Sequence, residues 1–300
     1  MSSGSSLLKA RQRSGNIAAA SFLAPAIIIL IIYIAYPIVS SFATSTLQWS
    51  GISSDKTFIG LDNWAKLLKD GSFWSAFRNN LVIMFLSLLF QVPFAMALAT
   101  FLDIVGKKGV FFKIMWFLPY LISPVAIGIL FKYVLDANYG LFATISKMLG
   151  GGSVDLLGNP ELALYAVIGV ISWQYIPFYM IYYLAAYGNI STDLYEAASI
   201  DGATRWKYFW SIALPGLKPT IISGATLSII GSLKYFDLIF VMTGGGPGVS
   251  TELMSTYMYK TAFTSFNMGY GSAVACGMFL LITIIALLTI QGLNRLGREK

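Results

Sequence analysis

The 300-residue sequence contains no histidine and a single cysteine. Without histidine the chain lacks the commonest general base and metal ligand. One cysteine cannot form an intrachain disulfide, and without histidine it cannot build a zinc site or a Cys/His nucleophile. Cys276 lies in an apolar run, so we expect its thiol to serve packing. These absences exclude zinc enzymes and enzymes that use a Cys/His pair.

Charged residues are scarce as well, at 11% of the chain against a globular norm of about 25%. Hydrophobic residues make up 57%, a balance typical of a protein in a lipid bilayer. The phosphate-binding pattern G-x-x-x-x-G-K followed by Ser or Thr is also absent, and Gly106-Lys-Lys-Gly109 does not match it. If ATP drives this protein, another chain must bind it. We expect this chain to be no enzyme, and to bind no cofactor or metal.

Six apolar segments are long enough for a membrane-spanning helix, which needs about 20 residues. They are Ile17–Phe42, Asn79–Leu102, Ile114–Leu135, Leu162–Tyr187, Thr220–Met242 and Tyr270–Gln291. Pro119 and Pro124 interrupt the third segment. The first is longer than the roughly 7–15 apolar residues of a signal peptide, so we expect an uncleaved span. The predicted fold is all-α and polytopic, with six transmembrane helices.

Basic residues accumulate on one side of these spans. With the N-terminus placed inside, the inner segments hold twelve basic and five acidic residues, whereas the outer segments hold seven of each. Because cytoplasmic loops carry the excess of Lys and Arg, both termini are predicted to be cytoplasmic. The net charge of +7 then reflects topology, and no nucleic-acid partner is expected.

Three outer loops are substantial. The first, residues 43–78, contains a predicted short helix over Asp62–Leu68. The second covers Asp136–Glu161, and the third begins Thr243-Gly-Gly-Gly-Pro-Gly248. Three consecutive glycines and a proline at the outer end of a span predict a tight, non-helical turn.

Charge within the spans is scarce, and Lys234 and Asp237 lie three residues apart in the fifth span. On one helix they would share a face, and an unpaired charge there costs roughly 2.5–3.5 kcal/mol. Two interpretations are open: the pair neutralises itself, or it lines a substrate path. Ser228, Ser232 and Tyr235 extend the polar stripe. A single carboxylate inside the membrane argues against a proton- or sodium-coupled carrier.

The fourth span concentrates aromatic and amide side chains around Pro177. Aromatic rings with polar edges suit the apolar faces and hydroxyls of sugars, although packing or interface aromatics have the same composition. The candidates for a substrate path on this span are Trp173, Gln174, Tyr175, Phe178 and Tyr179. Six of the ten prolines fall inside spans. Each removes a helical hydrogen bond, and bent helices favour a protein with an internal cavity.

The polar loop over 189–219 separates the fourth and fifth spans on the predicted inner side. Ser191, Thr192 or Asp193 can cap a short helix over Leu194–Ile200, and Asp193 has capping-box spacing to Glu196. This helix either lies in a groove of a partner protein or rests on lipid headgroups as a connector.

After this helix, Asp201-Gly202 is predicted to break the chain, because glycine accepts a positive φ. We expect a second helix over Ala203–Ala213, with an apolar face at helical spacing. Pro215 and Pro219 are predicted to end it before the fifth span.

The residues Glu196-Ala-Ala-x3-Gly202-x9-Ile212-x-Leu-Pro215 resemble, without a gap, the signature of permease subunits of bacterial ATP-binding-cassette importers. Further stretches are similar to the first permease subunit of the carbohydrate branch, as in maltose and glycerol-phosphate systems. These stretches are Phe22-Leu-Ala-Pro25, Tyr36-Pro37, Phe58-Ile-Gly-Leu-Asp-Asn63 and Thr243-Gly-Gly-Gly-Pro247. The resemblance covers nearly the whole chain.

The resemblance implies a bacterial inner-membrane importer for a carbohydrate, with an anionic solute such as glycerol phosphate or an acidic sugar as the alternative. It implies a second homologous permease, two cytoplasmic ATPase subunits that bind ATP and Mg, and an extracytoplasmic substrate-binding protein. The implied coupling residues, which contact the ATPases, are Glu196, Ala197, Ala198, Asp201 and Gly202. The implied docking residues for the binding protein are Thr243, Gly244, Gly245, Gly246 and Pro247.

On this basis we predict four parts. They are a cytoplasmic tail over 1–16, the first helix and outer loop over 17–78, a core permease domain over 79–291 that contains the coupling loop 189–219, and a cytoplasmic tail over 292–300. Two other classes remain as alternatives: a secondary carrier or channel that works alone, and an intramembrane enzyme. Co-purification with an ATP-hydrolysing subunit separates the importer from both.

Overall fold

The computed structural model describes residues 20–152 and 154–298. These residues group into two compact units: those up to Leu68 together with Thr261–Cys276, and those from Lys69 to Lys260 together with those from Gly277 onward. The predicted tail over 1–16 and the predicted start of the first span lie outside the described residues. The predicted division into four parts stays a prediction.

In the part of the chain that the structure describes, five helices are long and apolar enough to cross a membrane. They are Ala20–Thr44, Gly71–Leu121, Ala163–Tyr187, Arg205–Ser232 and Met268–Gly292, with a shorter apolar helix at Pro124–Val134. The stretch Gly71–Leu121 has 51 residues and contains the second predicted span and the first part of the third. The all-α, polytopic class is confirmed at this level, while the count of six stays a prediction.

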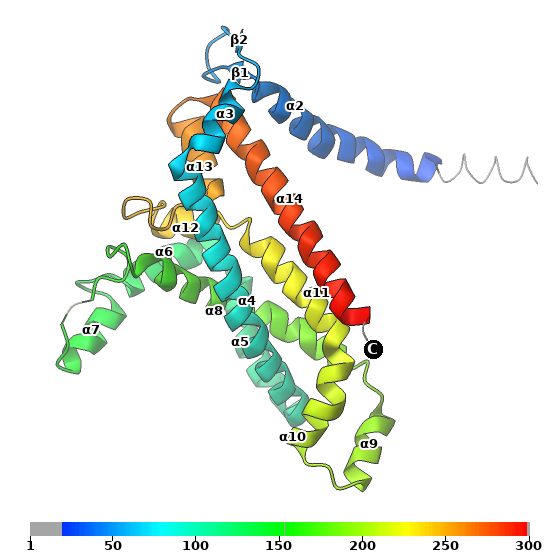
Figure 1. Ribbon diagram of the computed structural model, residues 1–300. Helices are drawn as coiled ribbons and strands as arrows, with labels where there is room; N and C mark the ends of the chain where they lie inside the picture. Colours follow the sequence, from blue (N-terminus) through cyan, green and yellow to red (C-terminus); the bar gives the residue numbers. More distant parts are fainter. Residues whose placement is uncertain (1–19, 153, 299–300) are drawn as a thin grey trace, which may run out of the picture. The chain divides into compact units, whose positions relative to one another are not determined.

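The first unit contains the long apolar helix Ala20–Thr44, which includes the π-helical turn η1 (Ile31–Ala35) and α2 (Tyr36–Thr44) (Figure 1). The antiparallel strands β1 (Leu47–Gln48) and β2 (Thr57–Phe58) and the helix α3 (Asp62–Lys69) follow it. The Asn63 side-chain amide donates to the carbonyls of Ser45 and Leu47, both at 2.9 Å. The predicted helix over Asp62–Leu68 is confirmed, whereas the hairpin is a small β element in a chain predicted to be all-α.

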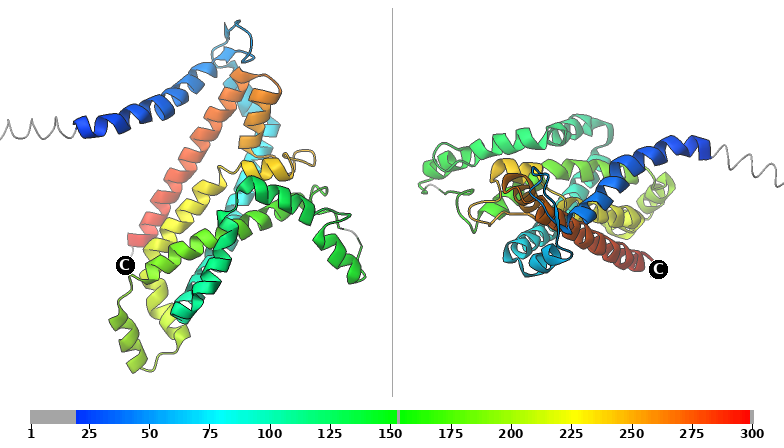
Figure 2. Two further views of the ribbon diagram at one scale, coloured as in Figure 1. Left: turned by 180° about the vertical axis from the view of Figure 1, so that it is seen from behind. Right: turned by 90° about the horizontal axis from the view of Figure 1, so that it is seen from above.

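The second unit begins with α4 (Gly71–Val105), which packs along α8 (Ala163–Tyr187) and α11 (Leu214–Ser232) (Figure 1). The short 3-10 turn η2 (Gly106–Gly109) follows, and Gly106 adopts φ 59° there. The chain then runs back through α5 (Val110–Leu121) to α6 (Pro124–Val134) (Figure 2). The interruption of the third predicted span is confirmed, because α5 ends at Leu121 and α6 begins at Pro124.

The remaining elements are short until the last helix. They are α7 (Leu141–Met148), α9 (Thr192–Ile200), α10 (Arg205–Tyr208), η3 (Phe209–Ala213), α12 (Asp237–Met242), α13 (Met254–Tyr259), η4 (Lys260–Thr264) and α14 (Met268–Arg298). The helix α9 lies at one end of the second unit, well away from α12 (Figures 1 and 2).

Two predictions about the fifth span are wrong. Pro215 and Pro219 do not end the second helix, since helical structure is continuous over Arg205–Ser232. The π-helical turn η3 directly precedes Pro215, and such a wider turn accommodates a residue without an N–H. At the other end, α11 stops at Ser232 and α12 starts at Asp237. The predicted span over Thr220–Met242 is therefore broken at residues 233–236, which we call the helix break.

Candidate functional site

Residues 243–248, which we call the glycine loop, form a tight turn. Gly244, Gly245 and Gly248 adopt φ of 59°, 91° and 60°, which confirms the predicted non-helical backbone. The hydroxyl oxygens of Thr243 and Thr251 lie 2.7 Å apart, and Thr251 also donates to the Gly246 carbonyl at 2.7 Å. The turn is thus closed by side chains as well as by backbone geometry.

An ion pair with a buried carboxylate supports this loop from one side. The Lys260 ammonium bonds the carboxylate of Glu252, which is 3% exposed. Thr256 donates to the other carboxylate oxygen at 2.6 Å. A Cβ on Gly245 would come within 2.4 Å of the Glu252 carboxylate, so the pair packs directly on the glycine backbone. The sequence did not predict this ion pair, because eight residues separate Glu252 and Lys260. Both had entered only the balance of basic and acidic residues in the predicted outer loops.

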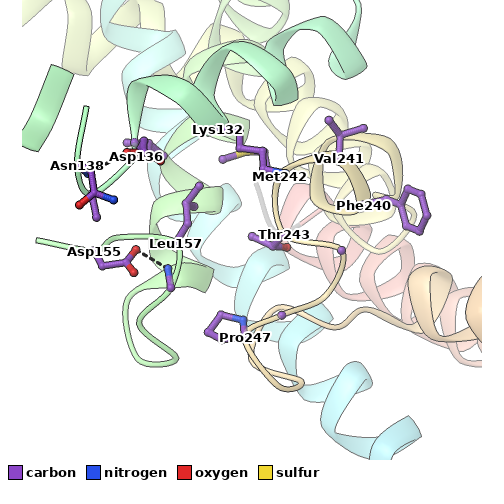
Figure 3. Close-up of a pocket in the computed structure, with 15 residues that line it drawn as sticks. Lys132, Asp136, Asn138, Asp155, Leu157, Phe240, Val241, Met242, Thr243 and Pro247 are labelled. Carbon is purple, nitrogen blue, oxygen red and sulfur yellow. Dashed lines mark hydrogen bonds between the residues drawn. The ribbon is translucent and has the colours of Figure 1, made fainter. Parts of the chain in front are cut away.

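An open cleft of about 620 Å³ lies beside the glycine loop (Figure 3). Asp136 and Asp155 line it opposite the loop, together with Lys132. The Asp136 carboxylate accepts the backbone N–H groups of Asn138 and Tyr139 at 2.8 and 3.0 Å. These bonds hold the pKa of Asp136 below its ordinary value. The cleft therefore presents charged and hydrogen-bonding groups at neutral pH.

The helix break exposes the two charges of the predicted fifth span. Lys234 lies within the break and Asp237 begins α12, and both side chains are exposed. The prediction that they share one helix face is wrong, because the helix ends before Lys234. The single salt bridge among the described residues is Lys260–Glu252, so Lys234 and Asp237 form no direct ion pair.

Aromatic rings from three elements meet beside this break. The Tyr175 ring lies 5.4 Å from that of Tyr235 and 6.0 Å from that of Tyr120. Phe178 lies 5.3 Å from Tyr120 and 5.1 Å from the buried Tyr179. Sequence reasoning had missed Tyr120, because it lies between two prolines in a segment of uncertain helicity.

The predicted polar stripe on α11 is buried against α4. Ser228 donates to the Gln91 side chain at 3.2 Å, and Ser232 donates to the Ser228 carbonyl at 2.7 Å. Gln91 is fully buried and was not among the predicted residues. A glutamine within a long apolar run is the feature of the sequence that could have indicated this residue.

Two predicted path residues lie apart from this group. The ring centroids of Trp173 and Phe131 lie 5.1 Å apart. Trp173 also lines an apolar groove together with Trp116. Gln174 is buried and donates to the Ile122 carbonyl at 3.2 Å, in the gap between α5 and α6. The structure therefore separates these two from Tyr175 and Phe178.

The helix α9 (Thr192–Ile200) lies within the polar loop over 189–219, and the predicted inner side stays a prediction. The Ser191 hydroxyl caps it by accepting the Asp193 N–H at 3.2 Å. Of the three predicted capping residues, Ser191 is the N-cap. Asp193 and Glu196 therefore do not form a capping box at the start of the helix. Glu196 and Ala197 are exposed while Ala198 is buried.

Gly202 ends the α9 turn with φ 67°, and no atom would lie within 4 Å of a Cβ placed on it. The Asp201 N–H caps the helix by donating to the Ala197 carbonyl at 3.0 Å. The rings of Tyr195 and Tyr208 pack edge to face at 5.2 Å and join α9 to α10.

The chain combines long apolar helices with a helix break that carries charged and aromatic side chains, and with an exposed helix in a polar loop. This combination is typical of a polytopic membrane protein of the transport class. Residues 91–295 match the family described as the binding-protein-dependent transport system inner membrane component. The chain belongs to this family. It is a multi-pass inner-membrane transport component, and in this family ATP is handled by separate ATPase chains.

Comparisons with individual proteins agree with this assignment. The multiple sugar-binding transport system permease protein MsmF of Streptococcus mutans is 32% identical over 90% of this chain and 93% of its own. A solved bacterial ABC transporter that imports the acidic polysaccharide alginate is 28% identical, with a TM-score of 0.81 over 98% of this chain and 99% of its own. A second alginate transporter structure, in complex with a pentasaccharide-bound periplasmic protein, is 27% identical with a TM-score of 0.81, over 96% of each chain.

Proposed function

We propose that this chain is the permease subunit of an ATP-driven importer that moves a sugar or oligosaccharide into the cell by alternating access. The observation that carries the substrate class is the meeting of Tyr120, Tyr175 and Tyr235 beside the exposed break. Such rings offer apolar faces for stacking and hydroxyls for hydrogen bonds. The likeness to MsmF and to the alginate transporters supports a carbohydrate.

The assembly that we propose contains a second homologous permease subunit, two cytoplasmic ATPase subunits and an external substrate-binding protein. Six spans with both termini inside place α9 in the cytoplasm, as the charge distribution supports. The exposed Glu196, Ala197 and Gly202 then act as the coupling surface on the ATPases, with Ala198 and Asp201 shaping the helix end. ATP-driven closure of the ATPase pair moves α9 and opens the cavity outward, and hydrolysis resets it inward.

On the opposite side, the glycine loop and the adjoining cleft form the docking surface for the binding protein. The turn is closed by Thr243 and Thr251 and supported by the Glu252–Lys260 pair, so it presents a fixed backbone. The cleft adds the charged Asp136 and Lys132. A preorganised surface loses little conformational entropy on binding, which suits a partner that must dock and leave repeatedly.

The substrate path is tested by a matched pair of variants on α8. In liposomes that contain the complete importer, Tyr175→Ala should lower uptake of the transported oligosaccharide by up to about tenfold, as expected for losing roughly 0.5–1.5 kcal/mol of aromatic contact. Trp173→Ala should leave uptake close to the parent level, because Trp173 faces Phe131 and the apolar groove. Equal effects from both variants would contradict the proposed path.

An anionic substrate is the second candidate, and one observation favours it. Lys234 is exposed, and the described residues form no salt bridge with it, so its ammonium is available to an acidic sugar, and the alginate importers carry such a substrate. Lys234→Ala should then reduce uptake of an acidic oligosaccharide by about tenfold and leave a neutral one unchanged, as for one lost charge-assisted bond. Unchanged uptake of both would exclude any substrate role for this lysine.

A further inference from the structure

Two neighbouring asparagines at the start of α4 make different sets of contacts. Asn80 is fully buried, and its amide reaches two segments that are 153 and 174 residues away in the sequence. Asn79, one position earlier, binds the segment that follows the glycine loop, and its side chain bonds no other described segment. The pair offers a natural comparison, since the residues have the same side chain on the same helix.

Asn80 holds the helix break. A broken helix leaves carbonyl groups without their usual partners, and inside a membrane each must be satisfied by another group. Asn80 donates through Nδ2 to the Leu233 carbonyl at 3.3 Å. Ser255, from the first turn of α13, donates to the Tyr235 carbonyl at 2.5 Å. Two carbonyls of the break are therefore bound by side chains from other elements.

The same asparagine also holds the start of α13. Its Oδ1 accepts the Met254 N–H at 3.0 Å. Both the oxygen and the nitrogen of this buried side-chain amide are therefore hydrogen-bonded. Asn80 thus connects the break, which carries Lys234, to the segment between the glycine loop and α13.

Asn79 has no contact of this kind with the break. Its amide donates to the carbonyls of Val249, Ser250 and Glu252, at 3.2, 3.1 and 3.0 Å. Asn79 therefore holds the segment that follows the glycine loop, and it does not hold the helix break.

We propose that Asn80 is a positioning residue that sets the conformation of the helix break and links it to the segment behind the glycine loop. Displacement of that segment is transmitted to the break through Met254, Asn80 and Leu233, with Ser255 and Tyr235 as a parallel connection. The meaning of this link for transport rests on the proposed function, in which the glycine loop docks the binding protein and the break lines the path.

The geometry is tested without reference to transport. The complete importer in membranes would carry Lys234→Cys and Cys276→Ser, and reaction with a membrane-impermeant maleimide would report access to the break. Adding Asn80→Ala should raise the rate of maleimide labelling about tenfold. This factor corresponds to the loss of one buried hydrogen bond. Asn79→Ala should leave the rate unchanged. Equal rates for the Asn80 variant and its parent would overturn the proposal.

Two further variants cover the case in which Asn80→Ala does not assemble. Asn80→Asp retains the acceptor for Met254 but loses the donor to Leu233, and Ser255→Ala removes the partner of the Tyr235 carbonyl. Both should raise labelling at position 234. If neither does so in an assembled importer, the break is held by its own backbone and the proposal fails.

The link to docking has its own readout. Asn80→Ala should reduce ATPase stimulation by the loaded binding protein while leaving that protein's affinity for the importer unchanged, whereas Asn79→Ala should weaken the affinity. A loss of affinity in both variants would refute the assigned link. Failure of the parent importer to respond to the binding protein would instead refute the proposed function, and the labelling result would still stand.

Discussion

The glycine loop and the end of α9 each contain a tight turn at a glycine of positive φ. The surroundings of these two glycines differ. Gly245 adopts φ 91° and is enclosed by Glu252 and Lys260, so a side chain there has neither a favourable backbone nor space. Gly202 adopts φ 67° and has open space where a side chain would project. The turn at Gly245, the predicted outer turn, is therefore enclosed by its own chain. The turn at Gly202, the predicted inner turn, has open space beside it among the described residues.

The largest effect is expected at the inner turn. Gly202→Asp should abolish substrate-stimulated ATPase activity in the assembled importer while leaving membrane insertion intact, because the side chain enters space that this chain leaves open. Gly202→Asn serves as the matched control: it tolerates positive φ equally well without adding a charge, and it should retain more activity. Normal stimulation of the Asp variant would refute the coupling assignment.

At the outer turn the expected loss is in stability. Gly245→Ala combines a disfavoured φ with a clash against the Glu252 carboxylate, and should cost about 2–4 kcal/mol. A lower midpoint of thermal unfolding of the purified importer would show this. Gly246→Ala is the control, since its φ is not positive and its nearest contact would be 3.4 Å. Similar midpoints for the two variants would contradict the contrast between enclosed and open glycines.

A smaller effect is expected from the ion pair behind the loop. Glu252→Gln keeps an acceptor for Thr256 but leaves Lys260 without its counter-charge. Because the Lys260 side chain is 36% exposed, water relieves part of this loss, and about 1–2 kcal/mol of stability should disappear. Thermal unfolding measures it, with Asp155→Asn as a control on the far side of the cleft. An unchanged midpoint would show that the glycine loop does not depend on the pair.

Local features of the chain were predictable from sequence because they follow from neighbouring residues. Apolar length located the helices, three glycines and a proline indicated the outer turn, and a polar break in an apolar chain indicated α9. The helix after Gly202 was misjudged at Pro215, because a π turn upstream of a proline leaves no pattern in hydropathy. Such a turn depends on how Phe209–Ala213 packs.

The helix break was not predictable for a different reason. Apolar residues continue through Leu233 and on to Met242, so periodicity gave one span where the structure has two helices. The groups that satisfy the freed carbonyls, Asn80 and Ser255, come from elsewhere in the chain. Their role depends on long-range pairing, which a single sequence does not reveal. Only the residue types of the candidate path, aromatic and charged, could be named in advance.

The proposed import function is tested by reconstitution of this chain in liposomes with the proposed second permease, ATPase subunits and binding protein. The binding protein and a labelled oligosaccharide are placed outside and ATP inside. The oligosaccharide should accumulate inside, and this accumulation should require ATP, the binding protein and this chain together. Accumulation by this chain in the absence of the ATPase subunits would contradict it, and would indicate a carrier or channel that works alone.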